Sequence, residues 1–175
     1  MKYFAYGSNM LSERLTKRVF SASNPKHYAL RKHRLRFHKK SIDCSGKCSI
    51  VKTESDKDIV HGVLYDVADD EIDALDSAEG VGYGYMRSEL TLQINGALTK
   101  VCTYIAEQKY ITESLVPYKW YYDLVLAGAE QHALPSDYVA GLQAVPFTHD
   151  PKPDRKSRLE ALEVLKKYED SKKKC

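Results

Sequence analysis

The sequence predicts an α+β protein with about five or six strands in a small, mostly antiparallel curled sheet or barrel. Residues 85–94 and 97–105 alternate apolar and polar side chains around Asn95-Gly96, a pair that readily adopts the positive φ angles of a two-residue hairpin turn. Short connections join the other strand candidates, and apolar residues at helical spacing follow them. These features favour antiparallel pairing over a parallel, doubly wound sheet.

The first elements surround a short glycine-containing turn. Residues 2–5 are expected to form a strand, and residues 10–19 a helix with Ser8 or Asn9 as its N-cap. A second helix is expected over 68–78, ended by Gly80. The remaining strands before the hairpin are expected at 34–38, 47–53 and 59–67.

The C-terminal part is predicted to be helical. Helices are expected over 117–131 and 136–143, followed by an exposed linker at 147–156. Ser157 and Glu160 have the spacing of a capping box and would open a last helix. We therefore divide the chain into a domain at 1–146 and a linker with a basic helix and tail at 147–175.

Composition and charge restrict the class of protein. The 175 residues contain no apolar run long enough to span a bilayer and no signal peptide, so a cytoplasmic protein without a membrane partner is expected. The net charge is +3, but residues 151–175 alone hold nine Lys or Arg and five Asp or Glu. The rest of the chain is close to neutral, which disfavours a nucleic-acid partner.

Four cysteines are few for this length, and we expect them to be reduced thiols. Cys44 and Cys48, with His33 and His38 upstream, have a spacing that zinc sites sometimes use. The two histidines lie on an expected strand and no second paired cluster follows, so neither a metal nor another cofactor is predicted.

Two segments are candidates for chemistry. Tyr6-Gly7-Ser8-Asn9 lies where a strand meets a helix, where free backbone N–H groups can bind an anion, although a simple turn with a helix cap explains the same residues. Glu79 stands beside Gly80 at the C-terminal end of a helix, where the helix dipole disfavours a negative charge. An acid in this position is a candidate general base, or a tolerated surface residue.

Three blocks resemble the γ-glutamylcyclotransferase-like proteins. Tyr6-Gly7-Ser8-Asn9-Met10, directly after the first strand, resembles the family's YGSN signature. Residues 74–80 and then Gly84-Tyr85-Met86-Arg87 are similar to its second block, and residues 117–121, with Gly128-Ala129 and Leu134-Pro135, to its late helix. The blocks occur in the family's order over residues 2 to about 145.

The resemblance implies a small β-barrel flanked by helices and a specific set of roles. Glu79 would be the acid/base, and Tyr121 would line the pocket, with Tyr118 as the competing choice. Arg87 would position the structure. The substrate loop would hold a γ-glutamyl unit through backbone groups of Tyr6, Gly7, Ser8, Asn9, Met10 and Leu11. Tyr118 stands where family members often carry Ser, which changes the expected shape of the pocket.

The implied reaction is the intramolecular cyclisation of a γ-glutamyl amide, which releases 5-oxoproline and an amine or amino acid. Glu79 would take a proton from the substrate's α-ammonium and give one to the leaving nitrogen. Three alternatives remain: an enzyme of the same fold acting on another γ-glutamyl compound, such as a γ-glutamylamine or a γ-glutamyl-protected biosynthetic intermediate; an inactive ligand sensor of the same fold; and a weak nucleic-acid binder using the basic strand 31–40 and the lysine-rich tail. The sequence leaves the oligomeric state open.

Overall fold

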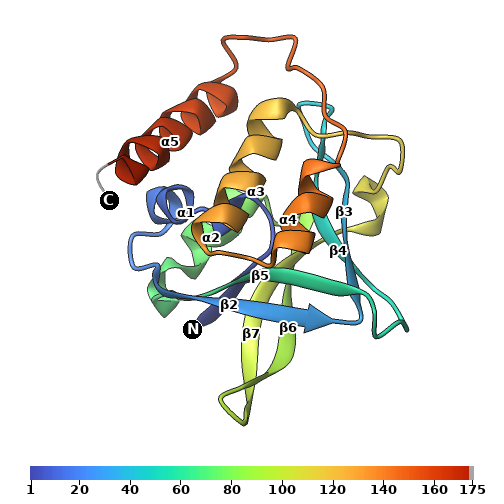
Figure 1. The fold of residues 1–175 in the computed structure, drawn as a ribbon, viewed down its shortest axis with the longest axis vertical. Helices are drawn as coiled ribbons and strands as arrows, with labels where there is room; N and C mark the ends of the chain where they lie inside the picture. The colour runs from blue at the N-terminus through green and yellow to red at the C-terminus, as the bar shows by residue number, and fades with distance from the viewer. Residues whose placement is uncertain (174–175) are drawn as a thin grey trace.

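The computed structural model describes residues 1–173, which form a five-stranded sheet, a separate two-stranded ribbon and helices packed around them (Figure 1). The large sheet has the strand order β2-β5-β1-β7-β6. Its strands are β1 (Lys2–Ala5), β2 (Ser23–Arg31), β5 (Ile59–Asp66), β6 (Tyr85–Ile94) and β7 (Ala97–Ala106). The ribbon pairs β3 (His33–Lys40) with β4 (Gly46–Lys52).

The α+β class and the mostly antiparallel pairing are confirmed, but the barrel is not closed. β1 pairs antiparallel with β5 and parallel with β7 at Tyr3–Cys102. Strands β2 and β6 are left as the two edges of the large sheet. Because β3 and β4 pair with each other, they do not bridge these two edges, and the sheet stays open.

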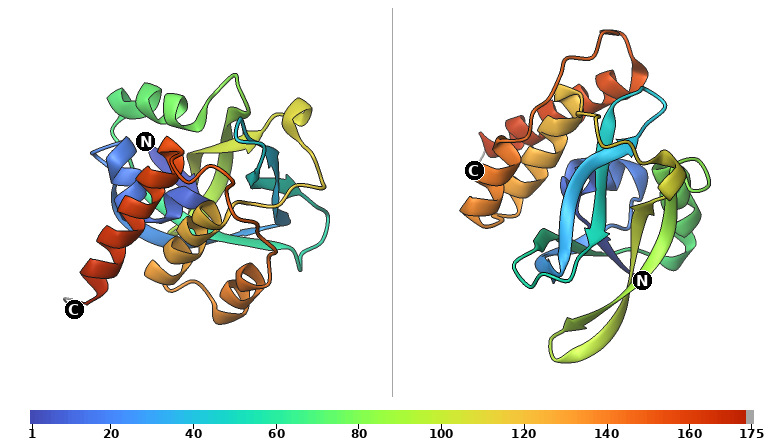
Figure 2. Two further views of the ribbon diagram at one scale, coloured as in Figure 1. Left: turned by 90° about the horizontal axis from the view of Figure 1, so that it is seen from above. Right: turned by 90° about the vertical axis from the view of Figure 1, so that its right-hand side faces the viewer.

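The hairpin prediction is confirmed. β6 and β7 pair in continuous register from Tyr85–Ala106 to Ile94–Ala97. Asn95 and Gly96 have φ angles of 51° and 84°, the left-handed conformation that a tight two-residue turn requires. The hairpin projects away from the helices (Figure 2).

Residues 1–173 contain five α-helices. They are α1 (Ser12–Arg18), α2 (Ile72–Glu79), α3 (Lys119–Gln131), α4 (Ser136–Gln143) and α5 (Lys156–Lys172). α5 packs against α3 and α1 (Figures 1 and 2), burying Ala161, Val164 and Tyr168. Asp150, whose side chain is fully buried, accepts hydrogen bonds from Trp120 and Arg155 and so fixes the segment before α5. The domain boundary at residue 146 stays a prediction, and Lys174 and Cys175 of the predicted tail lie outside the described residues.

Two predicted helix caps are wrong. α1 follows Leu11, because Ser8 and Asn9 belong to a short 3-10 turn, Ser8–Met10, and their side chains bond to other elements. α5 begins at Lys156 without a side-chain cap, so Ser157 falls inside the first turn. Gly80, by contrast, ends α2 in the left-handed conformation as predicted, with φ of 67°.

No helix among residues 1–173 combines the length and apolar character needed to cross a membrane.

Candidate active site

The substrate loop predicted at residues 6–11 is buried at the centre of the molecule. It follows β1, which lies between β5 and β7 in the middle of the large sheet. Asn9 is 3% exposed, and Met10 and Leu11 are fully buried. α3 crosses directly against the loop: a Cβ added to Gly128 would lie 2.6 Å from the Leu11 backbone nitrogen. Position 128 therefore requires glycine, because α3 lies too close to the loop to leave room for a side chain there.

Glu79 points back to this loop from the last turn of α2. Its Oε1 accepts hydrogen bonds from Asn9 Nδ2 at 2.7 Å and from an Arg18 terminal nitrogen at 2.6 Å. Arg18 also donates to Asn9 Oδ1 at 2.9 Å, which closes a three-residue network. Oε2 has no hydrogen-bond partner among residues 1–173. One carboxylate oxygen is thus fixed and the other is free to exchange a proton.

A small cavity adjoins this carboxylate. Its volume is about 30 Å³, roughly the space of one water molecule. It is lined by Tyr3, Tyr6, Gly7, Ser8, Asn9, Cys48, Glu79, Tyr85, Tyr104 and Tyr121. We call this space the inner cavity. Burial raises the pKa of Tyr6, Tyr85 and Tyr121 well above the usual value, so these hydroxyls remain neutral.

The tyrosine hydroxyls are held by hydrogen bonds to the backbone. Tyr121 Oη accepts from the Cys48 N–H at 3.0 Å, and Tyr85 Oη donates to the Cys48 carbonyl at 2.6 Å. Tyr6 Oη donates to the carbonyl of Tyr104. The rings are therefore rigid walls, because each polar tip has a partner in a buried position.

The inner cavity continues into a larger cleft of about 670 Å³, which we call the outer cleft. The two share Ser8, Glu79, Tyr85 and Tyr121. The outer cleft extends between α1, β3, β4, the end of α2 and the start of α5, whose Lys156 and Ser157 line it. A ligand of amino-acid or dipeptide size can thus reach Glu79 from this side.

The predicted site residues divide into two groups. Tyr6, Gly7, Ser8, Asn9, Glu79 and Tyr121 all line the inner cavity. Met10 and Leu11 line neither space, and the Met10 N–H donates to Gly7 O at 3.0 Å, so both residues belong to the core. Of the two competing tyrosines, Tyr118 lies outside both spaces and donates to the carbonyl of Asp43. Arg87 pairs with Asp76 at 3.1 Å.

Sequence reasoning missed Arg18 and Tyr85, and it considered Cys48 only for a zinc site, which it did not predict. Arg14 and Arg18 are four residues apart, beside the apolar positions Leu11 and Leu15, so helical spacing could have placed them next to the loop. Burial raises the pKa of the Cys48 thiol to about 12, which makes it a neutral wall residue. Cys44 is exposed, and residues 1–173 contain no cluster of three or more His, Cys, Asp or Glu placed to hold a metal ion.

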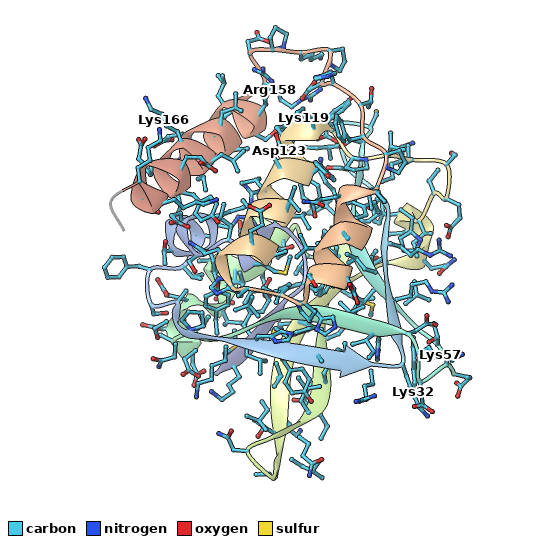
Figure 3. All side chains as sticks on the ribbon, viewed as in Figure 1. Lys32, Lys57, Lys119, Asp123, Arg158 and Lys166 are labelled. Carbon is cyan, nitrogen blue, oxygen red and sulfur yellow. The ribbon has the colours of Figure 1, made fainter. Side chains whose placement is uncertain are left out.

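The basic segment 31–40 does not form one charged face. Lys39 is buried, whereas Lys32 and Arg34 lie within ion-pair distance of Asp56 and Asp58, at 3.7 and 2.9 Å. Figure 3 shows Lys32 and Lys57 at one corner of the molecule and Arg158 and Lys166 on α5, far from them. The nucleic-acid alternative gains no support from this arrangement, because its two basic segments are separated.

A buried loop, one enclosed carboxylate and an adjoining cleft are the features of an enzyme's active site. Residues 59–142 match the AIG2-like family. The chain is 31% identical over 148 residues to gamma-glutamylcyclotransferase of Bos taurus, an alignment that covers 82% of this chain and 77% of the relative. The Homo sapiens gamma-glutamylcyclotransferase is 30% identical over 149 residues, with the same coverage.

A solved structure of a gamma-glutamyl cyclotransferase has the same fold. It superposes with a TM-score of 0.79 and 26% identity, covering 95% of this chain and 98% of that one. The chain belongs to the γ-glutamylcyclotransferase family of enzymes.

Proposed function

We propose that this protein cyclises a γ-glutamyl amide to 5-oxoproline and releases the amine, with Glu79 as the only acid/base. The observation that carries the proposal is the position of Glu79. Its carboxylate lies between the substrate loop and the tyrosine walls, with Oε1 fixed by Asn9 and Arg18 and Oε2 free. The family's name and the site geometry support the same reaction.

The reaction proceeds through proton transfers at Glu79 and forms no covalent enzyme intermediate. Glu79 Oε2 takes a proton from the substrate's α-ammonium, and the neutral amine attacks the γ-carbonyl carbon to close a five-membered ring. Glu79 then gives this proton to the amide nitrogen, and the bond between this nitrogen and the carbonyl carbon breaks. The ring nitrogen loses its second proton to Glu79, which passes it to the departing amine, so the products are neutral lactam and an ammonium group and the carboxylate is restored. Because nucleophile and electrophile belong to one molecule, the enzyme supplies orientation and proton transfer.

In this proposal, the substrate loop binds the negatively charged groups of the substrate. The N–H groups of Ser8 and Asn9 begin a helical turn and have no acceptor among the described residues, as expected at such a position. Arg14 Nε donates to Ser8 Oγ at 3.1 Å, and its guanidinium has no carboxylate partner among residues 1–173. We assign these groups to the α-carboxylate of the γ-glutamyl unit or to the oxygen that gains charge during ring closure.

The proposal is tested by measuring 5-oxoproline release. γ-Glutamyl amino acids and γ-glutamyl amines are incubated with the protein, and both products are quantified by chromatography. Equal amounts of 5-oxoproline and free amine are expected from at least one compound. Glutamate in place of 5-oxoproline would indicate hydrolysis, and no product from any compound would contradict the proposal.

The tyrosine wall gives a second expected result. Tyr121→Phe removes the acceptor of the buried Cys48 N–H, which should cost about 1–3 kcal/mol of unfolding free energy. We also expect a lower kcat/KM for 5-oxoproline formation, because Tyr121 holds Cys48 beside Gly7 and both line the inner cavity together with Glu79. Tyr118→Phe is the matched control, since its hydroxyl bonds outside the inner cavity. Equal losses of kcat/KM in both variants would contradict the assignment of Tyr121.

A cytoplasmic location remains part of the proposal. Cys44, Cys48 and Cys102 are free thiols, which is typical of proteins in reducing compartments.

A further inference from the structure

The cations of the outer cleft differ in whether they have a carboxylate partner. Four of them are paired: Arg18 with Glu79 at 2.6 Å, Lys47 with Asp43 at 2.8 Å, Arg155 with Asp150 at 2.7 Å and Lys156 with Glu160 at 4.0 Å. Arg14 and Lys39 also line this cleft, and no carboxylate of residues 1–173 lies within ion-pair distance of either. Arg14 donates to Ser8 and is assigned to the γ-glutamyl unit, whereas Lys39 has no assigned partner. A cation in this position can serve an anion that comes from outside the chain.

Lys39 reaches the cleft because strand β3 is irregular. The pairing of β3 with β4 shifts between Arg36 and Lys39, so the alternation of inward and outward side chains is interrupted. His38 and Lys39 are consecutive, yet both are buried, and Lys39 is only 7% exposed. A buried lysine without a counter-ion is costly, which makes a purely structural role for this side chain unfavourable.

Gly84, just before β6, and Tyr85, its first residue, fix the position of the Lys39 ammonium group. Lys39 Nζ lies 4.7 Å from the centroid of the Tyr85 ring, a cation–π contact. A Cβ on Gly84 would lie 2.5 Å from both Cε and Nζ of Lys39, so a side chain there would displace the ammonium group from this position. Because Tyr85 lines both spaces, Lys39 stands where the inner cavity opens into the outer cleft.

The electrostatic surroundings agree with this placement. Burial lowers the pKa of Lys39, while the charges of Glu79 and Asp43 act in the opposite direction without forming an ion pair with it. The Lys39 ammonium group is therefore attracted electrostatically by Glu79 but remains available to a ligand. A carboxylate bound there would be separated from Glu79 by a positive charge, which removes the repulsion between two acids in one cleft.

We propose that Lys39 is a specificity-determining residue that binds an anionic group, a carboxylate, on the leaving amine of the γ-glutamyl substrate. The inference rests on the proposed function. With the γ-glutamyl unit at the loop and the reacting nitrogen at Glu79, the substituent on that nitrogen points into the outer cleft. An amino acid carries its carboxylate one carbon from this nitrogen, at the opening where Lys39 stands.

The first test uses the wild-type protein and two substrates that differ only in charge. γ-Glutamyl-alanine carries the carboxylate, and γ-glutamyl-alaninamide has the same shape without the negative charge. We expect kcat/KM for γ-glutamyl-alanine to be roughly 10- to 100-fold higher, the range of one hydrogen bond to a charged group. Equal values would overturn the role of Lys39 but leave the cyclisation intact, and so would 5-oxoproline from γ-glutamyl amines but from neither alanine compound. No 5-oxoproline from these two compounds or from any other γ-glutamyl compound tested would overturn the proposed function.

Two variants test whether Lys39 causes the preference for γ-glutamyl-alanine over γ-glutamyl-alaninamide. Lys39→Met should raise KM for γ-glutamyl-alanine by about the same factor and reduce the preference to near unity, with kcat for the alaninamide little changed. Lys40→Met is the matched control, because Lys40 is the next residue of the strand and is exposed; its preference should equal that of the wild type. A uniform loss of kcat on both substrates in Lys39→Met would contradict a specificity role and indicate a role in chemistry or folding.

Discussion

Replacing Glu79 with Gln should lower kcat for 5-oxoproline formation by at least about 100-fold, the lower end of what general acid–base catalysis contributes. The amide keeps the shape of the side chain and an oxygen that accepts from Asn9 and Arg18. It cannot take a proton from the α-ammonium, so ring closure loses its base. KM should change little, because the residues assigned to the γ-glutamyl unit are untouched. Initial rates at saturating substrate measure this.

The same substitution leaves Arg18 without a charged partner, and this needs a control. The two side chains are 22% and 14% exposed, so the loss of stability should be smaller than the roughly 3–5 kcal/mol seen for a fully buried pair. Asp76→Asn on the same helix breaks the neighbouring pair with Arg87. It should cost stability without a comparable loss of kcat. Wild-type turnover in Glu79→Gln would refute the assignment of the acid/base.

Replacing Gly128 with Ala should destabilise the protein, although alanine is the better helix former. The added methyl group would lie 2.6 Å from the Leu11 backbone nitrogen and 2.7 Å from Met10 Cβ. These are core positions that cannot move aside, so α3 must shift away from the substrate loop. Overpacking of this kind costs about 1–3 kcal/mol, more than the roughly 1 kcal/mol that alanine gains in a helix. Urea unfolding measures the net change in unfolding free energy, and turnover should fall together with the stability.

Gly141 in α4 provides the matched comparison. A Cβ there would meet nothing within 4 Å, and the backbone is helical. Gly141→Ala should therefore increase the unfolding free energy by up to about 1 kcal/mol. If both variants were stabilised, the close contact between α3 and the loop would not exist as described.

Local signals predicted the regular elements well. Asn95-Gly96 determines its own turn, and Gly80 ends its own helix, because the required φ angles depend on one or two residues. Strand β2 was not predicted, because its own residues carry no strong local signal. It contains Pro25, most of its residues are exposed, and within the large sheet it pairs only with β5, so it lacks the alternation of a half-buried strand.

Tertiary contacts determined what the sequence could not predict. Ser8 and Asn9 have the composition of helix caps, but their side chains bond to Arg14 and Glu79 instead. Asn9 and Glu79 are 70 residues apart in the chain, and no local pattern reports such a contact. The burial of Lys39 follows from an irregularity in the β3–β4 pairing, which composition does not reveal. The resemblance named Glu79, but only the fold shows what holds it.

The tyrosine walls also have a consequence for product release on the proposed function. The inner cavity is enclosed by the substrate loop, the tyrosine rings and Cys48, and it shares Ser8, Glu79, Tyr85 and Tyr121 with the outer cleft. A γ-glutamyl unit bound at the shared residues, on the loop side, would have the departing amine between itself and solvent. The amine would then diffuse out first and the ring second, so 5-oxoproline would be the product that competes with the next substrate molecule for the free enzyme.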